Sequence, residues 1–318
     1  MVVAMDQLST RIGVVNLQNE YVSPLSVVEL KLRSNPSAVQ ELIVHLKQHI
    51  LKSDIPAPKF IGIGIGMPGF INANEGINYT YLATGQKTLT QHLQDEMGIP
   101  VYIDNDSALI AMAELKFGAA ATVKNAMVIN MGWGIGLGMI VNGSLFKGHN
   151  GFAGEFSHIS MSDENIRCTC GKQGCLEAVA SLLAMAEKAI SGIQQGRVSR
   201  MSYIKNLTSK VEVGNAIIEE ANKGDQYAIE LLRESAYKIG RGLAILIHIM
   251  NPQLIILNGR CVKVANLMLG PIHQALEKYC IPRLYTHTEI VISPVGFEAE
   301  LIGASILVME NLGKYKKA

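Results

Sequence analysis

Three of the five cysteines in this chain lie between positions 168 and 175, close to a histidine, and this cluster constrains the fold most strongly. The donors are His158, Cys168, Cys170 and Cys175. Three thiolates and one imidazole form a closed tetrahedral set, which suits a structural zinc ion with no open position for chemistry. The alternative is a surface loop of reduced thiols with an unrelated histidine, but this spacing favours a metal site.

Two glutamates, Glu155 and Glu177, bracket the cysteine–histidine cluster. A rigid metal-bound loop with a carboxylate at each end can direct two hydrogen-bond acceptors at one polyol. The stretch therefore indicates a polyol ligand beside the metal.

Composition excludes several classes of protein. The chain has 318 residues, 48% of them hydrophobic, which is enough for one large or two medium globular domains. Its net charge of +1 gives no basic field for nucleic acid. The sequence lacks an apolar run of membrane-spanning length and a basic segment at its start, so we expect no membrane span and no signal peptide. Clustered, metal-like cysteines point to the reducing cytoplasm.

The stretch from Glu155 to Glu177 resembles the zinc and sugar motif of the ROK family, although Ser157 stands where that family has glycine. The family contains bacterial repressors, uncharacterised open reading frames and sugar kinases. The resemblance covers nearly the whole chain and is greatest to sugar-responsive repressors of the N-acetylglucosamine and xylose type, without their DNA-binding segment. It implies an α/β protein with the two-domain actin-like, ribonuclease-H-like fold of ATPases and sugar kinases.

Strands alternate with crossover helices in two successive rounds, which by itself predicts two α/β domains with a cleft between them. We expect an N-terminal domain over residues 1–115, with a terminal helix at 298–314 packing back on it. Residues 116–297 would form the larger second domain with the zinc loop. Within this second domain we expect a helix over 176–191 and a mobile polar connection over 194–210.

The predicted strand at residues 100–103 brings Asn105 and Asp106 to its carboxyl end, where ligands gather in open α/β sheets. By resemblance, Asn105 would bind sugar hydroxyls and Asp106 would be the catalytic base if the chain is a kinase. Alternatively, Asp106 caps the following helix. The full set of sugar contacts that the resemblance implies is Gly69, Asn105, Asp106, Glu155, His158 and Glu177.

The first nucleotide loop departs from the kinase pattern Asp-x-Gly-x-Thr. Asp6 and Thr10 match it, but Leu8 occupies its glycine position, and Ser9 beside it is not glycine either. Glycine in such a turn lets backbone N–H groups approach a phosphate, and a leucine blocks that approach. We interpret this loop as degenerate for ATP.

Two later loops carry further departures. Gly132 and Gly134 lie where kinases of the family have Gly-Thr-Gly-x-Gly, and Trp133 replaces the threonine. Gly259 follows Asn258 where those kinases present two glycines to adenosine. The nucleotide side therefore differs from the kinase pattern at several positions.

These observations favour a sugar-sensing effector domain of a ROK-type regulator, without enzymatic activity. The first alternative is an ATP-dependent kinase of hexoses or N-acetylhexosamines, with Asp106 as base, Asp6 near Mg²⁺ and Thr10 near phosphate. The second is an orphan sugar-binding protein with neither activity. The chain begins directly at the first strand, so DNA would be a partner only through a segment that it does not contain. By resemblance we expect a dimer or tetramer.

Overall fold

The computed structural model describes residues 1–162, 165–207 and 209–312, and its chain divides into two compact units. The first unit comprises Met1–Gly118, Leu145–Ala153 and the chain from Glu298 onward. The second comprises Ala119–Ser144 and Gly154–Phe297. Among the helices so described, none is long and apolar enough to cross a membrane.

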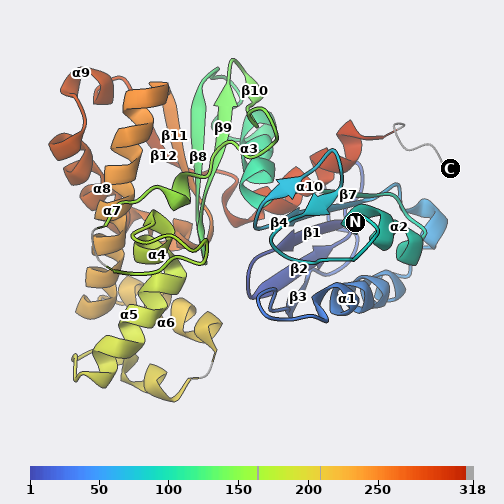
Figure 1. Ribbon diagram of the computed structural model, residues 1–318, viewed down its shortest axis with the longest axis horizontal. Helices are drawn as coiled ribbons and strands as arrows, with labels where there is room; N and C mark the ends of the chain where they lie inside the picture. The colour runs from blue at the N-terminus through green and yellow to red at the C-terminus, as the bar shows by residue number, and fades with distance from the viewer. Residues whose placement is uncertain (163–164, 208, 313–318) are drawn as a thin grey trace. The chain divides into compact units, whose positions relative to one another are not determined.

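A mixed five-stranded sheet forms the centre of the first unit, in the order β3-β2-β1-β4-β7 (Figure 1). Strands β1, β2 and β3 pair antiparallel, and β1, β4 and β7 pair in parallel. The strands of the first unit, including a small separate hairpin, are β1 (Val2–Met5), β2 (Ser9–Gly13), β3 (Ser26–Glu29), β4 (Ile63–Met67), β5 (Ile71–Asn72), β6 (Ile77–Asn78) and β7 (Val101–Asn105).

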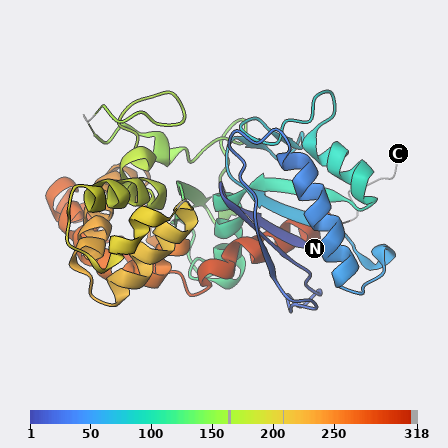
Figure 2. The ribbon, with the colours of Figure 1, turned by 90° about the horizontal axis from the view of Figure 1, so that it is seen from below.

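Helices cover both faces of this sheet (Figures 1 and 2). On one face, the buried side of α1 (Ala38–Lys52) packs with β1, β4 and β7, through residues spaced as an amphipathic helix requires. A short 3-10 turn, η1 (Ala57–Lys59), follows α1, and α2 (Leu89–Met97) lies on the same face. On the other face, α3 (Asp106–Phe117) and α10 (Ala299–Glu310) pack against β1.

The last helix, α10, approaches the sheet very closely. A Cβ atom added to Gly64 of β4 would lie 2.1 Å from the carbonyl oxygen of Ala304. A Cβ atom on Gly303 would lie equally close, 2.1 Å, to the carbonyl oxygen of Leu109 in α3. The small residues therefore allow backbone-to-backbone packing that any larger side chain would prevent.

The second unit repeats this sheet order, as β10-β9-β8-β11-β12. Its strands are β8 (Ala126–Met131), β9 (Ile135–Val141), β10 (Ser144–Leu145), β11 (Leu254–Asn258) and β12 (Glu289–Ile292), and the last residue of β10 begins a segment of the first unit. Its helices are η2 (Phe156–His158), α4 (Leu176–Ala180), α5 (Leu182–Gln194), η3 (Arg200–Asn206), α6 (Lys210–Asn222), α7 (Gln226–Met250), η4 (Arg260–Val264), α8 (Ala265–Tyr279), α9 (Pro282–Tyr285) and η5 (Gly296–Glu298). Because the order repeats, the β1–β2 and β8–β9 turns occupy equivalent places in the two sheets.

Two segments of the second unit differ from expectation. The helix predicted over residues 176–191 is divided at Ser181, whose side chain accepts a hydrogen bond from the Ala184 amide and so begins a new helix, α5. The connection predicted over 194–210 contains the 3-10 helix η3, which buries Met201 and Ile204. Apolar side chains three positions apart were the available sequence signal for this turn.

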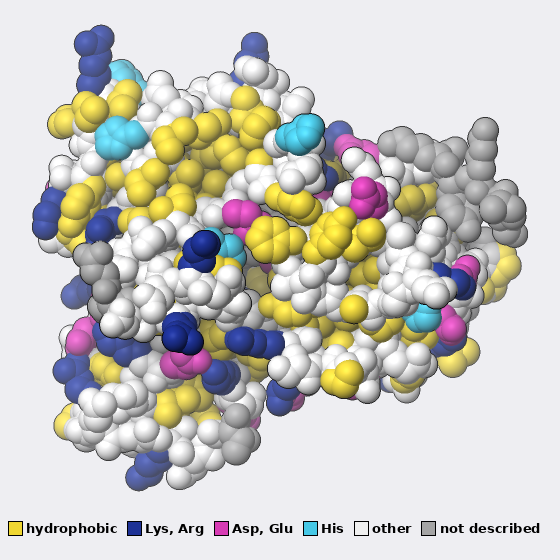
Figure 3. Space-filling model, viewed as in Figure 1, with side chains coloured by type: hydrophobic (Ala, Val, Ile, Leu, Met, Phe, Trp, Pro, Cys, Tyr) yellow, Lys and Arg dark blue, Asp and Glu magenta, His cyan; other side chains and the backbone are white. Residues whose placement is uncertain are grey.

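Charges of both signs alternate over the helices of the second unit, as Figure 3 shows for α5 and α6. Lys188 pairs with Glu234, and Lys210 pairs with Glu187. These pairs are exposed, and exposed pairs contribute about 0–1 kcal/mol each. They balance the surface charge, in agreement with the small net charge of the chain.

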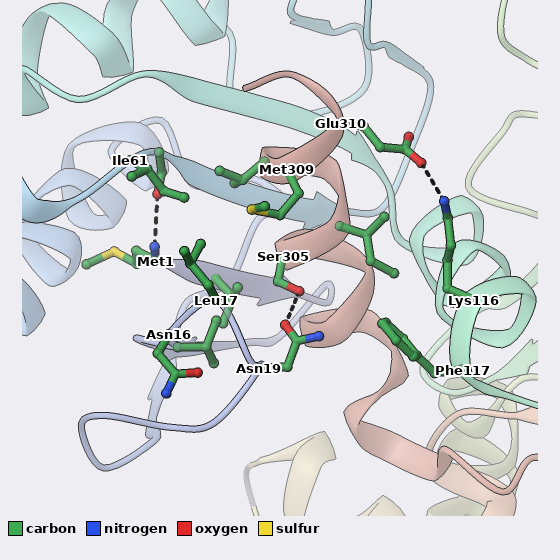
Figure 4. A pocket seen from close by; sticks show the side chains of 15 residues that line it. Met1, Asn16, Leu17, Asn19, Ile61, Lys116, Phe117, Ser305, Met309 and Glu310 are labelled. Carbon is green, nitrogen blue, oxygen red and sulfur yellow. Dashed lines mark hydrogen bonds and ion pairs between the residues drawn. The ribbon is translucent and has the colours of Figure 1, made fainter. Parts of the chain in front are cut away.

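A pocket of about 330 Å³ lies in the first unit (Figure 4). Leu17, Ile61, Phe117 and Met309 contribute apolar side chains to it, and Ser305 donates a hydrogen bond to Asn19 at one side. None of the sugar contacts predicted from the sequence lines this pocket. It is therefore separate from the candidate site of this unit.

Candidate metal and sugar site

The four predicted metal donors converge in the second unit. Their ligand atoms, from His158, Cys168, Cys170 and Cys175, all lie within 4.8 Å of one another. The Nδ1 atom of His158 is 3.5 Å from the sulfur of Cys168, and the sulfurs of Cys170 and Cys175 are 3.6 Å apart. The three cysteines are free thiols. This arrangement can hold a metal ion with three sulfur ligands and one nitrogen ligand.

Glycines in the left-handed region shape the loop that carries the cysteines. Gly171 has φ +88° and Gly174 has φ +71°, both unfavourable for residues with a side chain. A Cβ atom on Gly174 would lie 2.0 Å from the carbonyl oxygen of Ser162. Cys175 follows at once and precedes α4, where burial raises the pKa of its thiol to about 12. A bound cation would have to displace that proton.

His158 faces two groups with its two ring nitrogens. Its Nδ1 atom points to Cys168, whereas its Nε2 atom lies 3.7 Å from a carboxylate oxygen of Glu155. Burial lowers the pKa of His158, which favours the neutral ring that metals bind. A histidine that ligates a metal with one nitrogen commonly donates the other to a carboxylate or similar acceptor. The metal donors and Glu155 thus form one connected group.

Glu177 is positioned by the first turn of α4. Its carboxylate accepts a hydrogen bond from the Ile135 amide at 3.4 Å, and burial raises its pKa. The loop behind it is anchored to α7, where Gly242 leaves room for the rings and branches of Phe156 and Leu176. A half-buried carboxylate on a packed helix has the fixed direction that recognition of a hydroxyl requires.

In the first unit the structure brings Gly69 and Asn105 together. The Asn105 Nδ2 atom donates to the Gly69 carbonyl at 3.3 Å, and the Oδ1 atom accepts from the amides of Ser107 and Ala108. Asn105 is therefore the N-cap of α3, the role that the sequence had offered to Asp106. Asp106 is the first helical residue, and its Oδ1 atom accepts from the Ser107 amide at 2.6 Å.

An ion pair that the sequence did not predict lies beside this pair of residues. Lys147 contacts the carboxylate of Asp104, a residue that is almost fully buried at the end of β7. Because Lys147 belongs to Leu145–Ala153, the pair ties that segment to the first unit. The only sequence signal was a basic residue in a loop, and such a residue does not indicate which carboxylate it will pair with.

A second unpredicted pair is buried beneath the same sheet. Arg11, Ala4, Gly66 and Asp104 are paired in register across four strands, so they share one face. Small residues in the middle of this row leave space for Glu300 of α10, which pairs with the Arg11 guanidinium at 3.2 Å. Burial raises the pKa of Glu300 to about 8, and this effect outweighs the opposing effect of Arg11.

Replacing Glu300 with glutamine should remove a pH dependence of stability. Since the pKa of Glu300 is raised above its ordinary value of 4.5, its stabilising effect is complete below about pH 4.5 and is lost as the pH rises toward 8. The difference in unfolding free energy between the wild type and Glu300→Gln should change by up to ~1.4 kcal/mol per pH unit. Urea denaturation from pH 5 to 8 measures it, and a constant difference would contradict the assignment.

The first nucleotide loop is closed on itself. The Asp6 carboxylate accepts hydrogen bonds from the amides of Leu8 and Ser9, at 2.8 and 2.7 Å, and from the Ser9 hydroxyl at 2.8 Å. The amides that would meet a phosphate are therefore already bound to a carboxylate. The Thr10 hydroxyl is fully buried, and the described residues offer it no hydrogen-bond partner.

The second nucleotide loop carries a buried indole. Trp133 is only 2% exposed and lies against Gly214 of α6, where an added Cβ atom would come within 2.5 Å of its ring. The Arg260 guanidinium lies 5.2 Å from the Trp133 ring centre and 5.0 Å from that of Phe297. The indole of the Gly132–Gly134 turn is thus packed against α6 and Arg260. Nearby, Gly259 has φ +96° and sits too close to Asn130 for any side chain.

Comparison with known proteins identifies the family. The chain matches the ROK family over residues 10–311. It is 35% identical over 276 residues to a glucokinase of Halalkalibacterium halodurans, covering 85% of this chain and 81% of that one. It is 29% identical over 283 residues to the xylose repressor of Bacillus spizizenii, covering 88% and 70%. Regulators and kinases are thus both among its relatives.

Solved structures show the same fold. A ROK family transcriptional regulator described as a homolog of the E. coli MLC protein superposes with a TM-score of 0.79 at 23% identity, covering 98% of this chain and 77% of that one. A ROK glucokinase from Streptomyces griseus, in complex with glucose and AMPPNP, gives 0.79 at 24% identity, covering 97% and 98%. The chain is therefore a member of the ROK family and has its two-domain actin-like fold.

Proposed function

We propose that this chain is the sugar-binding effector domain of a ROK-type regulator and that it does not transfer phosphate. Its ligand would be a sugar or sugar derivative that contacts Gly69, Asn105 and Asp106 of the first unit. Glu155, His158 and Glu177 of the second unit would supply the other contacts. Acceptors and donors of this kind match the hydroxyl groups of a sugar. Contact with DNA would require a segment outside this chain, and the reduced cysteines fit work in the cytoplasm.

The state of the nucleotide loops carries this proposal. The amides of Leu8 and Ser9 are bound to Asp6, and Trp133 is buried where the kinase pattern has a threonine. Phosphate binding in such loops depends on free backbone amides and on glycines that allow close approach. A regulator needs the sugar contacts but not the nucleotide loops. This chain has the predicted sugar contacts, whereas its nucleotide loops depart from the kinase pattern.

We further propose that zinc occupies the cysteine–histidine cluster. In a tetrahedral zinc site, bonds of about 2.3 Å to sulfur and 2.0–2.1 Å to nitrogen place neighbouring ligands roughly 3.5–3.8 Å apart. The contacts of 3.5 and 3.6 Å between donor atoms fit that geometry. With four protein ligands, the ion would be structural and would fix Glu155 beside His158.

A sugar kinase is the second candidate, because Asp106 is present and a relative with 35% identity is named glucokinase. In that case Asp106 would accept the proton of the attacked hydroxyl. Phosphate transfer distinguishes the two candidates. Formation of ADP and sugar phosphate by the purified chain would support the kinase and reject the regulator.

The proposal predicts that one saccharide stabilises the protein against unfolding. Thermal unfolding with a panel of pentoses, hexoses and N-acetylhexosamines should identify it, since a ligand of the folded state raises the midpoint. Glu177→Gln should then weaken binding roughly 10- to 100-fold, because hydrogen bonds to charged groups contribute about 1.5–3 kcal/mol.

The matched control is Glu187→Gln, which changes an exposed glutamate of α5 that pairs with Lys210. This variant should bind the saccharide as the wild type does. Binding of no saccharide in the panel, or equal binding by Glu177→Gln, would contradict the proposed site.

A further inference from the structure

An aromatic cluster lies in the first unit, on the small β5–β6 hairpin and the segment facing it. The rings of Phe70 and Phe152 are 5.6 Å apart at 87°, and those of Tyr79 and Phe152 are 6.0 Å apart at 82°. Phe152 therefore makes perpendicular contacts with both of the others. Tyr79 is 57% exposed, so much of its side chain faces solvent.

The cluster is continuous with the predicted sugar contacts of this unit. Phe70 directly follows Gly69, whose carbonyl accepts from Asn105. The Phe70 amide donates to the Thr80 hydroxyl at 2.9 Å, and the Tyr79 amide donates to the Phe70 carbonyl at 2.9 Å. A Cβ atom on Gly69 would lie 2.7 Å from Thr80, so the turn and the hairpin are packed as one piece.

The segment that carries Phe152 is also held in place. Lys147 is paired with buried Asp104, and the Ala153 amide donates to the Lys147 carbonyl at 3.0 Å. Phe152 thus lies on a closed loop fixed to the first unit, and Glu155 follows it three residues later. The rings are pre-positioned, so a ligand would not have to order them.

We propose that Phe70, Tyr79 and Phe152 form an aromatic subsite for a second ring, so that the ligand is a disaccharide or another glycoside. This inference rests on the proposed sugar site and extends it. Tyr79 is more than half exposed, so ring surface beside Phe152 is open to a ligand. The C–H face of a sugar ring, or the ring of an aryl aglycone, packs on such a face, while a single sugar ring would use the polar contacts alone.

The test compares each monosaccharide with its own glycosides by calorimetric titration. The pairs are xylose with xylobiose, and glucose with cellobiose, maltose and phenyl β-glucoside. In one pair the glycoside should bind about tenfold or more tighter than the monosaccharide, corresponding to ~1.4 kcal/mol. Tyr79→Ala should abolish this preference, so that the two affinities agree within about twofold.

Tyr79→Phe keeps the ring and should retain the preference. Tyr203→Ala, which removes another exposed tyrosine from η3, should also retain it. If the protein binds a monosaccharide and its glycosides with equal affinity, the subsite is overturned and the proposed function stands. Binding of no saccharide at all would overturn both. A glycoside preference that survives in Tyr79→Ala would also overturn the assignment.

Discussion

Replacement of Cys170 by serine should release the metal ion and abolish sugar binding in the same variant. Cys170 is exposed, so the substitution removes a ligand with little direct effect on packing. Structural zinc contributes roughly 10–16 kcal/mol of apparent binding energy to small domains. Without it, the loop from His158 to Cys175 would lose its main constraint, and Glu155 and Glu177 would lose their fixed positions. Metal analysis measures the release of the ion, thermal unfolding the accompanying loss of stability, and saccharide titration the loss of binding.

Cys280→Ala is the matched control, because Cys280 is a free, buried thiol outside the metal cluster. It should retain one metal ion per chain and the sugar affinity of the wild type. A soluble, metal-free Cys170→Ser with full sugar affinity would show that the metal does not organise the sugar site.

Replacement of Trp133 by threonine should have the second large effect. Removing a buried indole from its contacts with Gly214 leaves a cavity, and such changes commonly lower stability by about 3–5 kcal/mol. Combined with Leu8→Gly and Ser9→Gly, the same change restores the glycine of the first loop and the hydroxyl of the second, and it removes the Ser9 hydroxyl that bonds to Asp6. We expect this triple variant to bind ATP–Mg²⁺ measurably and the wild type not to bind it.

Trp133→Phe separates the loss of stability from the gain of nucleotide binding. It keeps an aromatic ring in the cavity and lacks a hydroxyl, so it should lose less stability and gain no nucleotide binding. The Leu8→Gly, Ser9→Gly double variant tests the first loop in a protein with an intact core. Wild-type nucleotide binding as tight as that of the triple variant would contradict the role given to Trp133.

The features that a sequence pattern could reveal were local or periodic. The cysteine–histidine cluster was predictable because four donors lie within 18 positions, and the structure brings all four together. The alternation of strands and helices predicted two α/β units, because the hydrophobic pattern of a strand has a different period from that of a helix. The same difference in period made the apolar helix at the end of the chain recognisable. These signals depend on neighbouring residues only.

The features that sequence could not reveal depend on distant residues. Arg11 and Glu300 are separated by 289 positions, and Lys147 and Asp104 by 43. Such pairs follow from strand register and helix packing, which no local pattern encodes. The sequence offered Asp106 as an alternative N-cap of α3, whereas the structure gives that role to Asn105; both residue types are good caps, and only the backbone geometry distinguishes them.

The most direct test of the account is calorimetric titration of ATP–Mg²⁺ into the wild-type protein, with and without the saccharide that stabilises it. We predict no heat of nucleotide binding in either case, together with saturable binding of the saccharide alone. ATP binding that strengthens in the presence of the saccharide would contradict the account, because it would show that the closed loop at Asp6 and the buried Trp133 still admit a nucleotide.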